Sequence, residues 1–535
     1  MSTGAELIAR RLQEAGCRHA FGIPGGEVLA LMAALDAVGV KFSLCKHENA
    51  GGFMAEGTHH VTGAPAVLIA TIGPGAANMV NVVANAWQDR VPMIVLTAAI
   101  NEAEAASYTH QVFDHKDIFK PITKASLTVA DGAVDVIIDK ALAIALGGQP
   151  GPVHLDLPID VATKEQPDAL PVRRNAISPS VPADTAEFEA ARALLSQAER
   201  PVMIAGVDAL NSQADEEIAA LAREFNIPVL TTYKAKGIFP ESDAMCFGAA
   251  GLSPKADDIL LPFVQSADLV LLAGYDPIEM RKGWQNPWGS DCKVIEFTSV
   301  PNTHYMHQAT YSFVGDCRHG LRAFRKGVQP RQTWANGELK HLKAKLDTAF
   351  PADEAWGPAA VIDEVRKATP SDIVAGVDTG AHRILLSQMW ACEHPRTLLQ
   401  STGLCTMGCA LPLAIGASLA ADGKPSIAFT GDAGLEMILG ELATLRDLKL
   451  PVIIIVFVDA SLALIELKQR GMQMGNLGVD FGATDFVGVG KAMGGHAVQA
   501  SDRATLNAEV TAGLERKGFT LIACPIGERP YDGRI

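Results

Sequence analysis

Two aspartates have the surroundings of a divalent-cation site. Asp432 lies in the turn Gly431-Asp-Ala-Gly434 after an apolar run, and Asp459 follows the next apolar run 27 residues later. A glycine-rich turn between a strand and a helix exposes backbone N–H groups to a bound phosphate, and Mg²⁺ beside that phosphate prefers carboxylate ligands. One helix over residues 435–448 and one strand over residues 452–457 would return the chain to the same sheet edge. Taken alone, the pattern fits two ordinary loop aspartates equally well.

A glutamate near the N-terminus is the main candidate for acid–base chemistry. Glu48 lies in His47-Glu-Asn-Ala at the start of a predicted helix, and Gly73-Pro-Gly-Ala-Ala-Asn78 follows the next apolar run. A positioned carboxyl group can exchange a proton with a bound ligand. The alternative is a surface glutamate that the helix dipole stabilises. The glycine-rich segment close by favours the functional interpretation.

Two more segments contain residues of interest. Ser401-Thr-Gly403-Leu-Cys405-Thr-Met407-Gly is rich in small residues around one bulky methionine, and Gly380-Ala-His382 follows a predicted strand. Met407 can be a simple core filler, and His382 can be a loop residue with its hydrogen bonds satisfied. Both alternatives stay open at this point.

Apolar runs of strand length alternate with helical patterns along the chain, which is typical of α/β layers. We predict an α/β fold of three domains over residues 1–165, 185–330 and 358–535, each a mainly parallel sheet flanked by helices. A polar, proline-rich linker over residues 164–184 separates the first two, and a helical stretch around residues 339–346 leads to the third. Predicted strands cover residues 66–71, 92–97, 153–158, 201–206, 227–232, 269–274, 293–297, 373–377, 426–430, 452–457 and 520–524.

Composition narrows the classes of function. The formal net charge of -15 disfavours nucleic acid and anionic membranes as main partners. The 9 cysteines have no CxxC spacing, so we expect reduced thiols in a cytoplasmic protein. The N-terminus lacks the apolar core of a signal peptide, and no apolar run is long enough to span a bilayer.

Together these motifs resemble the thiamine-diphosphate enzymes of the acetolactate synthase, pyruvate oxidase and 2-oxo acid decarboxylase group. The Gly-Asp turn with its following strand is similar to the cofactor motif of that family, and the segments around Glu48 and Asn78 resemble its pyrimidine-binding half. The segments at residues 21–26 and 151–158 also match, so the resemblance covers nearly the whole chain. It implies two cofactor-binding domains around a central domain, with thiamine diphosphate and Mg²⁺ as cofactors.

The resemblance also implies roles for individual residues. Glu48 would activate the cofactor by holding a proton at N1′ of its aminopyrimidine, and Met407 would support the bent conformation of the cofactor. The implied Mg²⁺ ligands are Asp432, Asp459 and the carbonyl of Ser461. The other implied cofactor-binding residues are Gly25, Asn78, Gly380, His382, Gly403, Gly431, Ala433 and Gly434.

Several positions depart from the family pattern. Ala433 replaces the last glycine of Gly-Asp-Gly, Asp459 lies where asparagine is usual, and Cys405 replaces a glycine. Asp459 still offers an oxygen ligand and adds a negative charge. Ala433 must place a methyl group where glycine is usual.

The reaction is predicted less directly than the cofactor. Enzymes of this group form an enamine at C2, which then reacts with a carbonyl compound, a proton or an oxidant. Gln111 matches an active-site glutamine of acetolactate synthases, with His110 replacing a phenylalanine. We therefore predict a carboligase acting on a 2-oxo acid, and the alternative is a non-oxidative decarboxylase or an acetyltransferase.

Residues after Asp459 leave the substrate open. Ile465 lies where pyruvate decarboxylases have a catalytic glutamate, and Glu466 would point elsewhere on the helix. Lys468 replaces a tryptophan of biosynthetic acetolactate synthases; it would either attract an anionic substrate or be an ordinary surface lysine. The pair His59-His60 is expected to be solvated or structural.

Other expectations concern cofactors and partners. Residues 275–281 differ from the sequence of flavin-binding members, so FAD binding stays open without support. A cofactor-binding protein without turnover and a nicotinamide dehydrogenase are the other classes, and no Gly-x-Gly-x-x-Gly pattern supports the second. The resemblance implies a homo-oligomer, a dimer or a tetramer, with each active site shared between two subunits.

Overall fold

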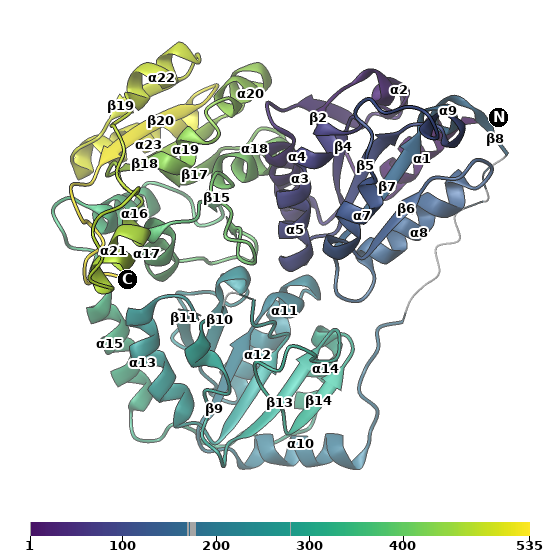
Figure 1. Cartoon of the computed structure of the whole chain (residues 1–535). Coiled ribbons are helices and arrows are strands. Elements are labelled where there is room, and N and C mark those ends of the chain that lie inside the picture. The colour runs from purple at the N-terminus through teal and green to yellow at the C-terminus, as the bar shows by residue number, and fades with distance from the viewer. Residues whose placement is uncertain (1, 168, 170, 172–177, 279) are drawn as a thin grey trace.

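A computed structural model describes residues 2–167, 169, 171, 178–278 and 280–535 of the chain. Three sheets of six parallel strands each lie in three separate parts of the molecule (Figure 1). The predicted α/β fold of three parallel-sheet domains is thus confirmed. The predicted linker includes residues 168, 170 and 172–177, which lie outside the described residues.

The first sheet has the strand order β3-β2-β4-β5-β7-β6. A two-stranded antiparallel pair, β1 (Ser2–Thr3) with β8 (Glu165–Gln166), joins the two ends of this part of the chain. Its strands are β2 (His19–Ile23), β3 (Lys41–Leu44), β4 (Ala66–Ala70), β5 (Met93–Ala99), β6 (Ala125–Thr128) and β7 (Pro152–Pro158). Its helices are α1 (Gly4–Glu14), η1 (Gly26–Val28), α2 (Leu29–Ala37), α3 (Glu48–Thr62), α4 (Pro74–Asn78), α5 (Val80–Gln88), α6 (Glu102–Ala105), α7 (His115–Phe119), η2 (Lys120–Ile122), α8 (Val134–Leu146) and α9 (Ile159–Thr163).

The central sheet has the order β11-β10-β9-β12-β13-β14. Its strands are β9 (Pro201–Ala205), β10 (Val229–Thr232), β11 (Cys246–Ala250), β12 (Leu269–Ala273), β13 (Lys293–Thr298) and β14 (Tyr311–Val314). The helices are α10 (Ala186–Gln197), α11 (Val207–Asn211), α12 (Asp215–Glu224), η3 (Tyr233–Ala235), α13 (Pro254–Gln265), η4 (Lys282–Trp284) and α14 (Cys317–Arg325). The predicted helical stretch between the second and third domains is α15 (Glu338–Ala349).

The third sheet has the order β16-β15-β17-β18-β20-β19. Its strands are β15 (Val374–Val377), β16 (Leu398–Gln400), β17 (Ser426–Gly431), β18 (Val452–Val458), β19 (His496–Gln499) and β20 (Thr520–Pro525). Its helices are α16 (Pro358–Lys367), α17 (Ala381–Met389), α18 (Ala410–Ala420), α19 (Asp432–Glu436), α20 (Glu441–Leu448), α21 (Ala463–Gly471), α22 (Phe486–Ala492) and α23 (Arg503–Glu515).

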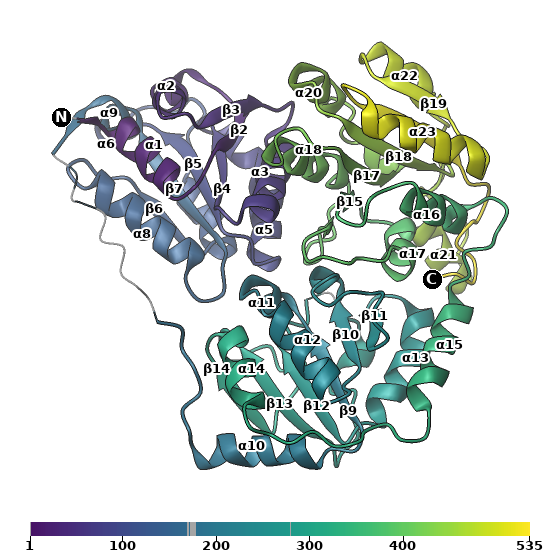
Figure 2. The same cartoon turned by 180° about the vertical axis from the view of Figure 1, so that it is seen from behind.

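The central strands are apolar on both faces because helices cover both sides of each sheet. In β4, Leu68 packs into one core cluster while Val67 and Ile69 pack into another on the opposite face. The cluster that contains Leu68 also contains Ile454 of β18, so the first and third domains share one apolar core. Helices α3 and α18 lie side by side between the two sheets, as both views show (Figures 1 and 2).

A buried charged group joins all three domains. Lys234 of η3 donates to a carboxylate oxygen of Glu56 at 3.3 Å, to one of Asp89 at 2.9 Å and to the carbonyl of Gln400 at 3.0 Å. Glu56 also bonds to His60, whose other ring nitrogen meets Arg396 at 2.8 Å. His59 and His60 are therefore buried structural residues, and the solvated alternative is wrong.

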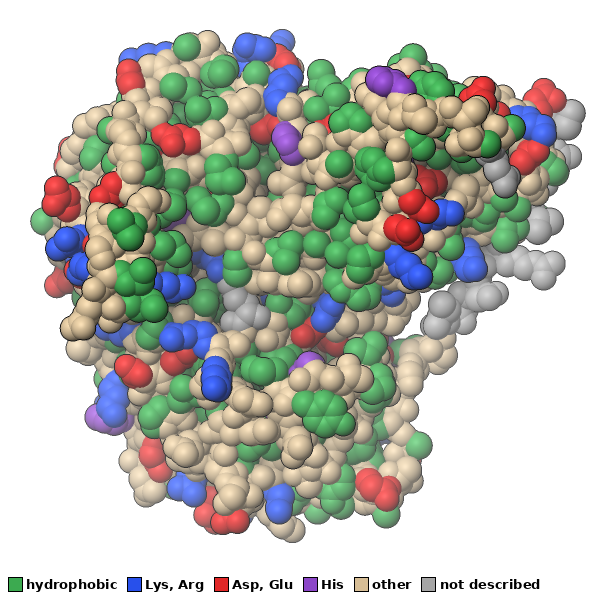
Figure 3. All heavy atoms as spheres, viewed as in Figure 1, with side chains coloured by type: hydrophobic (Ala, Val, Ile, Leu, Met, Phe, Trp, Pro, Cys, Tyr) green, Lys and Arg blue, Asp and Glu red, His purple; other side chains and the backbone are tan. Residues whose placement is uncertain are grey.

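Three further properties complete this description. No helix among the described residues is long and apolar enough to cross a membrane. Acidic and basic side chains are mixed over the face in Figure 3, with no single region of one sign. All 9 cysteines lie within the described residues and are thiols rather than disulfides, as expected.

Candidate active site

A cavity of about 130 Å³ opens beyond the carboxyl ends of β15, β17 and β18. This is the edge where open parallel sheets bind ligands. Its described lining residues all lie between residues 379 and 531, in the third domain. Nine of the predicted site residues line it: Gly380, His382, Met407, Gly431, Asp432, Ala433, Gly434, Asp459 and Ser461.

The predicted metal ligands lie together at one end of α19. The carboxylate of Asp432 accepts hydrogen bonds from the backbone N–H groups of Ala433 at 2.8 Å, Asp459 at 3.0 Å and Ala460 at 2.7 Å. These bonds tie the turn after β17 to the turn after β18. Asp432 is thereby held beside Asp459 and Ser461, as the parallel strands predict.

The electrostatics of this corner suit a cation. Burial raises the pKa of Asp432, and burial together with the charge of Asp432 raises the pKa of Asp459 to about 7. No Lys or Arg is among the described residues that line the cavity. Two neighbouring carboxylates without a protein cation form a donor set that a divalent metal ion would neutralise.

Two buried polar atoms of the cavity lining have no hydrogen-bond partner among the described residues. They are the hydroxyl of Thr379 and Nε2 of His382, and both residues line the cavity. Burial and the neighbouring Arg383 lower the pKa of His382 to about 3, so its ring is neutral, and it stacks on Phe457. The unpaired Thr379 hydroxyl can donate to a phosphate oxygen, whereas the His382 ring donates from Nδ1 to the Asp378 carbonyl, which leaves Nε2 of the neutral ring as an acceptor. The cavity therefore fits a diphosphate with its metal ion.

Asp378, which the motif analysis did not find, organises the loops around this cavity. Its carboxylate accepts from the N–H of Gly408 at 2.9 Å and from the hydroxyl of Thr430 at 3.0 Å. A Cβ on Gly434 would lie 2.2 Å from a carboxylate oxygen of Asp378. Glycine at position 434 thus allows the close approach that connects the Met407 loop to the Asp432 turn.

The loop around Met407 combines cavity lining with a contact between domains. Met407 lines the cavity, whereas Gly403 does not and instead donates its N–H to Asp89 of the first domain at 2.7 Å. Cys405 has φ of +52°, a left-handed conformation that glycine adopts most easily. The glycine found here in the family matches that conformation, and this chain adopts it with cysteine.

Glu48 is the first residue of α3 and is only 4% exposed. Asn78 at the end of α4 donates to its carboxylate at 2.9 Å, so these two predicted residues are in contact. Glu441 of α20 accepts the N–H groups of Lys46 and His47 at 2.9 and 3.1 Å. A buried acid of the third domain therefore fixes the chain just before Glu48.

The remaining predicted residues of the first domain surround this group without entering the cavity. Gly25 lies against Thr71 at the end of β4, where a Cβ would meet the threonine hydroxyl at 2.3 Å. His110 and Gln111 are exposed on the loop between α6 and α7. The predicted residues thus form two groups within one chain, one on each cofactor-binding domain.

One predicted element is wrong. The helix expected over residues 435–448 is two helices, α19 and α20, with Gly440 as the N-cap of the second. The chain turns between them because Gly440 has no side chain and approaches Lys46 of the first domain, where a Cβ would lie 3.2 Å from the lysine Cβ. The second helix thereby presents Glu441 to the start of α3.

Several residues of the cavity were missed. Tyr531 comes from the C-terminal segment, which is held by ion pairs from Arg470 to Asp532 and from Arg529 to Glu466. On α21, Ile465 lines the cavity, whereas Glu466 is buried in ion pairs with arginines. Lys468 is exposed and is not among the residues that line the cavity. The missed lining residues are Thr379, Ala381, Phe457, Leu462, Ala463, Leu464, Ile465 and Tyr531.

Comparison with known proteins matches three family models in chain order. The N-terminal TPP binding domain of thiamine pyrophosphate enzymes matches residues 2–118, the central domain matches residues 188–324, and the C-terminal TPP binding domain matches residues 378–524. Acetolactate synthase of Bacillus subtilis is 29% identical over 98% of this chain and 93% of its own length. The acetolactate synthase large subunit of Parasynechococcus marenigrum is 30% identical over 99% of this chain and 88% of its own length. The acetolactate synthase isozyme 1 large subunit of Escherichia coli is 30% identical over 87% of this chain and 83% of its own length.

Proposed function

Because this chain belongs to the thiamine pyrophosphate (thiamine diphosphate) enzyme family, we propose that it is a carboligase acting on a 2-oxo acid, like the acetolactate synthases it resembles. The observation that carries the proposal is the cavity at the end of the third sheet. It combines the buried carboxylate of Asp432 and the partly buried carboxylate of Asp459 with two buried polar atoms, on Thr379 and His382, that have no partner among the described residues.

Different residues of the cavity would bind different parts of the cofactor. Asp432, Asp459 and the carbonyl of Ser461 would hold Mg²⁺, the Thr379 hydroxyl would donate to the diphosphate, and His382 would line the wall beside it. Thiamine diphosphate supplies a carbon nucleophile for the 2-oxo group of a substrate. Met407 would support its bent conformation from the wall of the cavity.

Glu48 would supply the acid–base chemistry. Its buried carboxyl group, held by Asn78, would keep a proton at N1′ of the aminopyrimidine. Two structural elements keep it in place, since α4 carries Asn78 and Glu441 binds the residues just before Glu48. Gln111 and His110 would face the substrate from their exposed loop.

The lack of a further acid in the described lining of the cavity favours carboligation over simple decarboxylation. Among its described lining residues the only acids are the metal-ligand candidates Asp432 and Asp459. Ile465 lines the cavity where decarboxylases carry a glutamate, and the carboxylate of Glu466 accepts two hydrogen bonds from Arg470. Without a proton donor from α21, a second carbonyl compound is the favoured acceptor.

We also propose that two copies of the chain share each site. Glu48 belongs to the first domain and is absent from the described lining of the cavity in its own chain. Exposed apolar side chains next to the cavity, Met437, Ile465 and Met472, suit a covering subunit. A homodimer or a tetramer of two-fold symmetry would bring Glu48 of one copy to the cavity of the other.

Product analysis tests the proposed reaction. Purified protein with thiamine diphosphate, Mg²⁺ and pyruvate should form acetolactate, and Glu48→Gln should lower the rate by at least about 100-fold while cofactor binding persists. Acetaldehyde as the product would move the assignment to the decarboxylase alternative. Acetyl phosphate formed from pyruvate when phosphate and an electron acceptor are both added would indicate the acetyltransferase, because acetyl transfer from pyruvate removes two electrons.

A further inference from the structure

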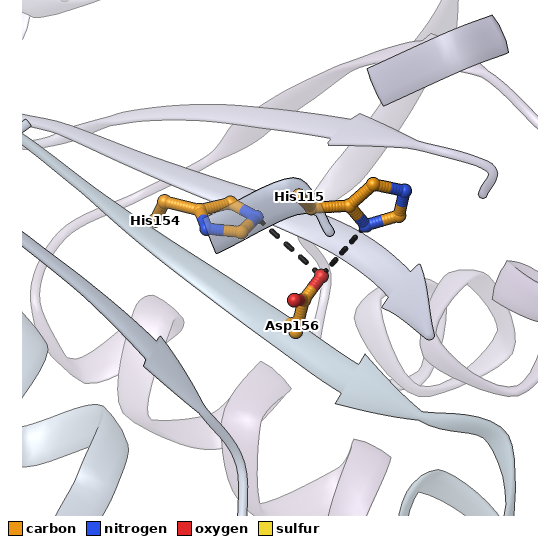
Figure 4. Close-up of side chains that lie close together, drawn as sticks. All are labelled: His115, His154 and Asp156. Atoms are coloured by element: carbon orange, nitrogen blue, oxygen red, sulfur yellow. Dashed lines mark hydrogen bonds and ion pairs between the residues drawn. The ribbon is translucent and has the colours of Figure 1, made fainter. Parts of the chain in front are cut away.

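A second buried polar cluster lies in the first domain, away from the cavity. It consists of His115 at the start of α7 with His154 and Asp156 on β7 (Figure 4), all three buried. His115 Nδ1 lies 2.8 Å from Asp156 Oδ1, and His154 Nε2 lies 3.6 Å from the same oxygen. None of these residues has a role in the proposed chemistry.

The contacts of the cluster fix the position of every proton. The N–H of Gly73 donates to His115 Nε2 at 3.2 Å, so this nitrogen is an acceptor and the proton of a neutral ring lies on Nδ1, facing Asp156. The Thr97 hydroxyl donates to Asp156 Oδ1 at 2.6 Å and must therefore accept from His154 Nε2 at 2.7 Å. His154 Nδ1 then accepts from the Ser126 hydroxyl at 2.7 Å.

This order makes the cluster a hydrogen-bond network rather than a cation site. A metal ion between the three residues would have to displace Thr97 from His154 and break the bond between His115 and Asp156. All four ring nitrogens already have partners within the protein. A closed network of this kind holds its members in one arrangement.

The network ends at the backbone that supports Glu48. Gly73 has φ of +70°, and a Cβ there would lie 2.4 Å from the carbonyl oxygen of Gln111. The turn at Gly73 opens α4, whose last residue is Asn78, the donor to Glu48. The loop with Gln111 leads directly into α7 and His115. The imidazole of His115 therefore joins the segment that holds Glu48 to the segment that carries Gln111.

We propose that His115 is a positioning residue that acts as the neutral tautomer with its proton on Nδ1. By accepting the N–H of Gly73 while Asp156 orients its ring, it holds the segment from Gly73 to Asn78, and with it the carboxyl group of Glu48. It also keeps the Gln111 loop against Gly73. The inference rests on the proposed function for the role of Glu48, while its structural part stands on the bonds described above.

Three variants separate the bond to Gly73 from simple packing. His115→Leu keeps an apolar volume but removes both bonds. His115→Gln offers an amide oxygen that can accept from Gly73 and an amide N–H that can donate to Asp156. Ser126→Ala, the matched control, removes the donor at the far end of the network and leaves His115 untouched.

The first readout needs neither cofactor nor substrate. Hydrogen exchange of the peptide over residues 71–79, measured by mass spectrometry on the apoprotein, should become at least about tenfold faster in His115→Leu. Wild-type rates should persist in Ser126→Ala and largely return in His115→Gln. Unchanged exchange in His115→Leu would overturn the proposal, because the Gly73 turn would then be held without His115.

The second readout is kinetic. His115 contacts no substrate, so His115→Leu should lower kcat about tenfold with the KM for pyruvate within about twofold, and His115→Gln should restore most of the rate. A changed KM with an unchanged kcat would contradict a role through Glu48. If the wild type has no activity with any 2-oxo acid, the proposed function fails, while the exchange result still decides whether His115 holds the turn.

A measurement on the wild-type protein removes the dependence on variant folding. The ring-nitrogen resonances of ¹⁵N-histidine-labelled protein, with His115 assigned by their loss in His115→Gln, should show a neutral ring protonated at Nδ1. A ring protonated at Nε2, or at both nitrogens, would overturn the proposal because neither form can accept the N–H of Gly73.

Discussion

Asp459 adds a negative charge at a position where the family motif usually has a neutral residue. An asparagine is usual there, and the aspartate raises the negative charge beside Asp432 while keeping an oxygen ligand. The structure accommodates the other departures locally, since Cys405 adopts the left-handed backbone and Ala433 donates its N–H to Asp432. The corner that we propose to bind Mg²⁺ therefore keeps Asp432 and Asp459 side by side despite these departures.

The first prediction compares two replacements of Asp459. Asp459→Asn keeps an oxygen ligand and should bind Mg²⁺ and thiamine diphosphate within about tenfold of wild type, whereas Asp459→Ala should lose more than about tenfold in Mg²⁺ affinity. Mg²⁺ titration of the cofactor-dependent activity, or of cofactor binding by calorimetry, measures both. Equal affinity in wild type and Asp459→Ala would remove Asp459 from the ligand set.

Residue patterns predicted part of the site because motif residues adjoin strand ends. Asp432, Asp459 and His382 follow or border β17, β18 and β15, and their place at one sheet edge follows from parallel strands. Tyr531 and Glu441 could not be found in this way. Each reaches its group from a distant part of the chain, and nothing in its immediate neighbours indicates the contact.

At the scale of elements, every predicted strand lies inside its sheet, whereas the edge strands and the interior strand β2 were missed. β4, β18 and β20 are continuous apolar runs because both faces are buried. Edge strands such as β14 and β3 are half exposed and carry mixed sequences, so no apolar run marks them. The division of α19 from α20 was missed because its cause, the approach of the first domain, is a tertiary contact.

The buried His154 on β7 bonds to Thr97 of β5 and Ser126 of β6, and its burial predicts that the folded protein loses stability in acid. Burial lowers the pKa of His154 to about 4, below the value near 6.5 of an unfolded chain. Between these two pH values the unfolded state binds a proton at His154 that the folded state does not bind. The contribution of His154 to the free energy of unfolding is therefore complete above about pH 6.5 and is lost as the pH falls toward about 4. Replacing His154 by Gln should reduce the difference between the unfolding free energies at pH 7.5 and pH 5.0 by about 2 kcal/mol.

Urea denaturation at the two pH values measures this difference. The control is His341→Gln, which removes an exposed histidine of α15 and should leave the pH dependence unchanged. An identical pH dependence in wild type and His154→Gln would mean that His154 is not held neutral in the folded protein.

At the scale of the whole molecule, the three domains meet around Lys234. Its side chain is buried between Glu56 and Asp89, which would be left without their cation if it were removed. Lys234→Met should therefore destabilise the protein by about 3–5 kcal/mol, seen as a lower melting temperature. Lys164→Met removes an exposed ion pair with Asp131 and should leave the melting temperature close to that of the wild type. Equal effects of the two substitutions would contradict a structural role for the domain junction.

Sharing of each site between two chains has a specific consequence. Glu48→Gln and Asp432→Ala should each be inactive alone, because one lacks the acid and the other a metal ligand. When the two variants are co-expressed, a mixed dimer would have one site with both residues intact, and random pairing would restore about a quarter of wild-type activity. Activity assays on the purified mixture measure this recovery. No recovery, with mixed dimers confirmed by two affinity tags, would place Glu48 and Asp432 of one chain in one site.

The central claim is that the cavity holds thiamine diphosphate through Mg²⁺. Isothermal titration calorimetry of the apoprotein with thiamine diphosphate, with and without Mg²⁺ and with Asp432→Ala as the comparison, tests it most directly. We expect saturable binding of one cofactor per chain in wild type with Mg²⁺, and binding weakened more than about tenfold by removal of Mg²⁺ or of Asp432. Absence of binding in the wild type, or binding that is indifferent to both changes, would contradict the account.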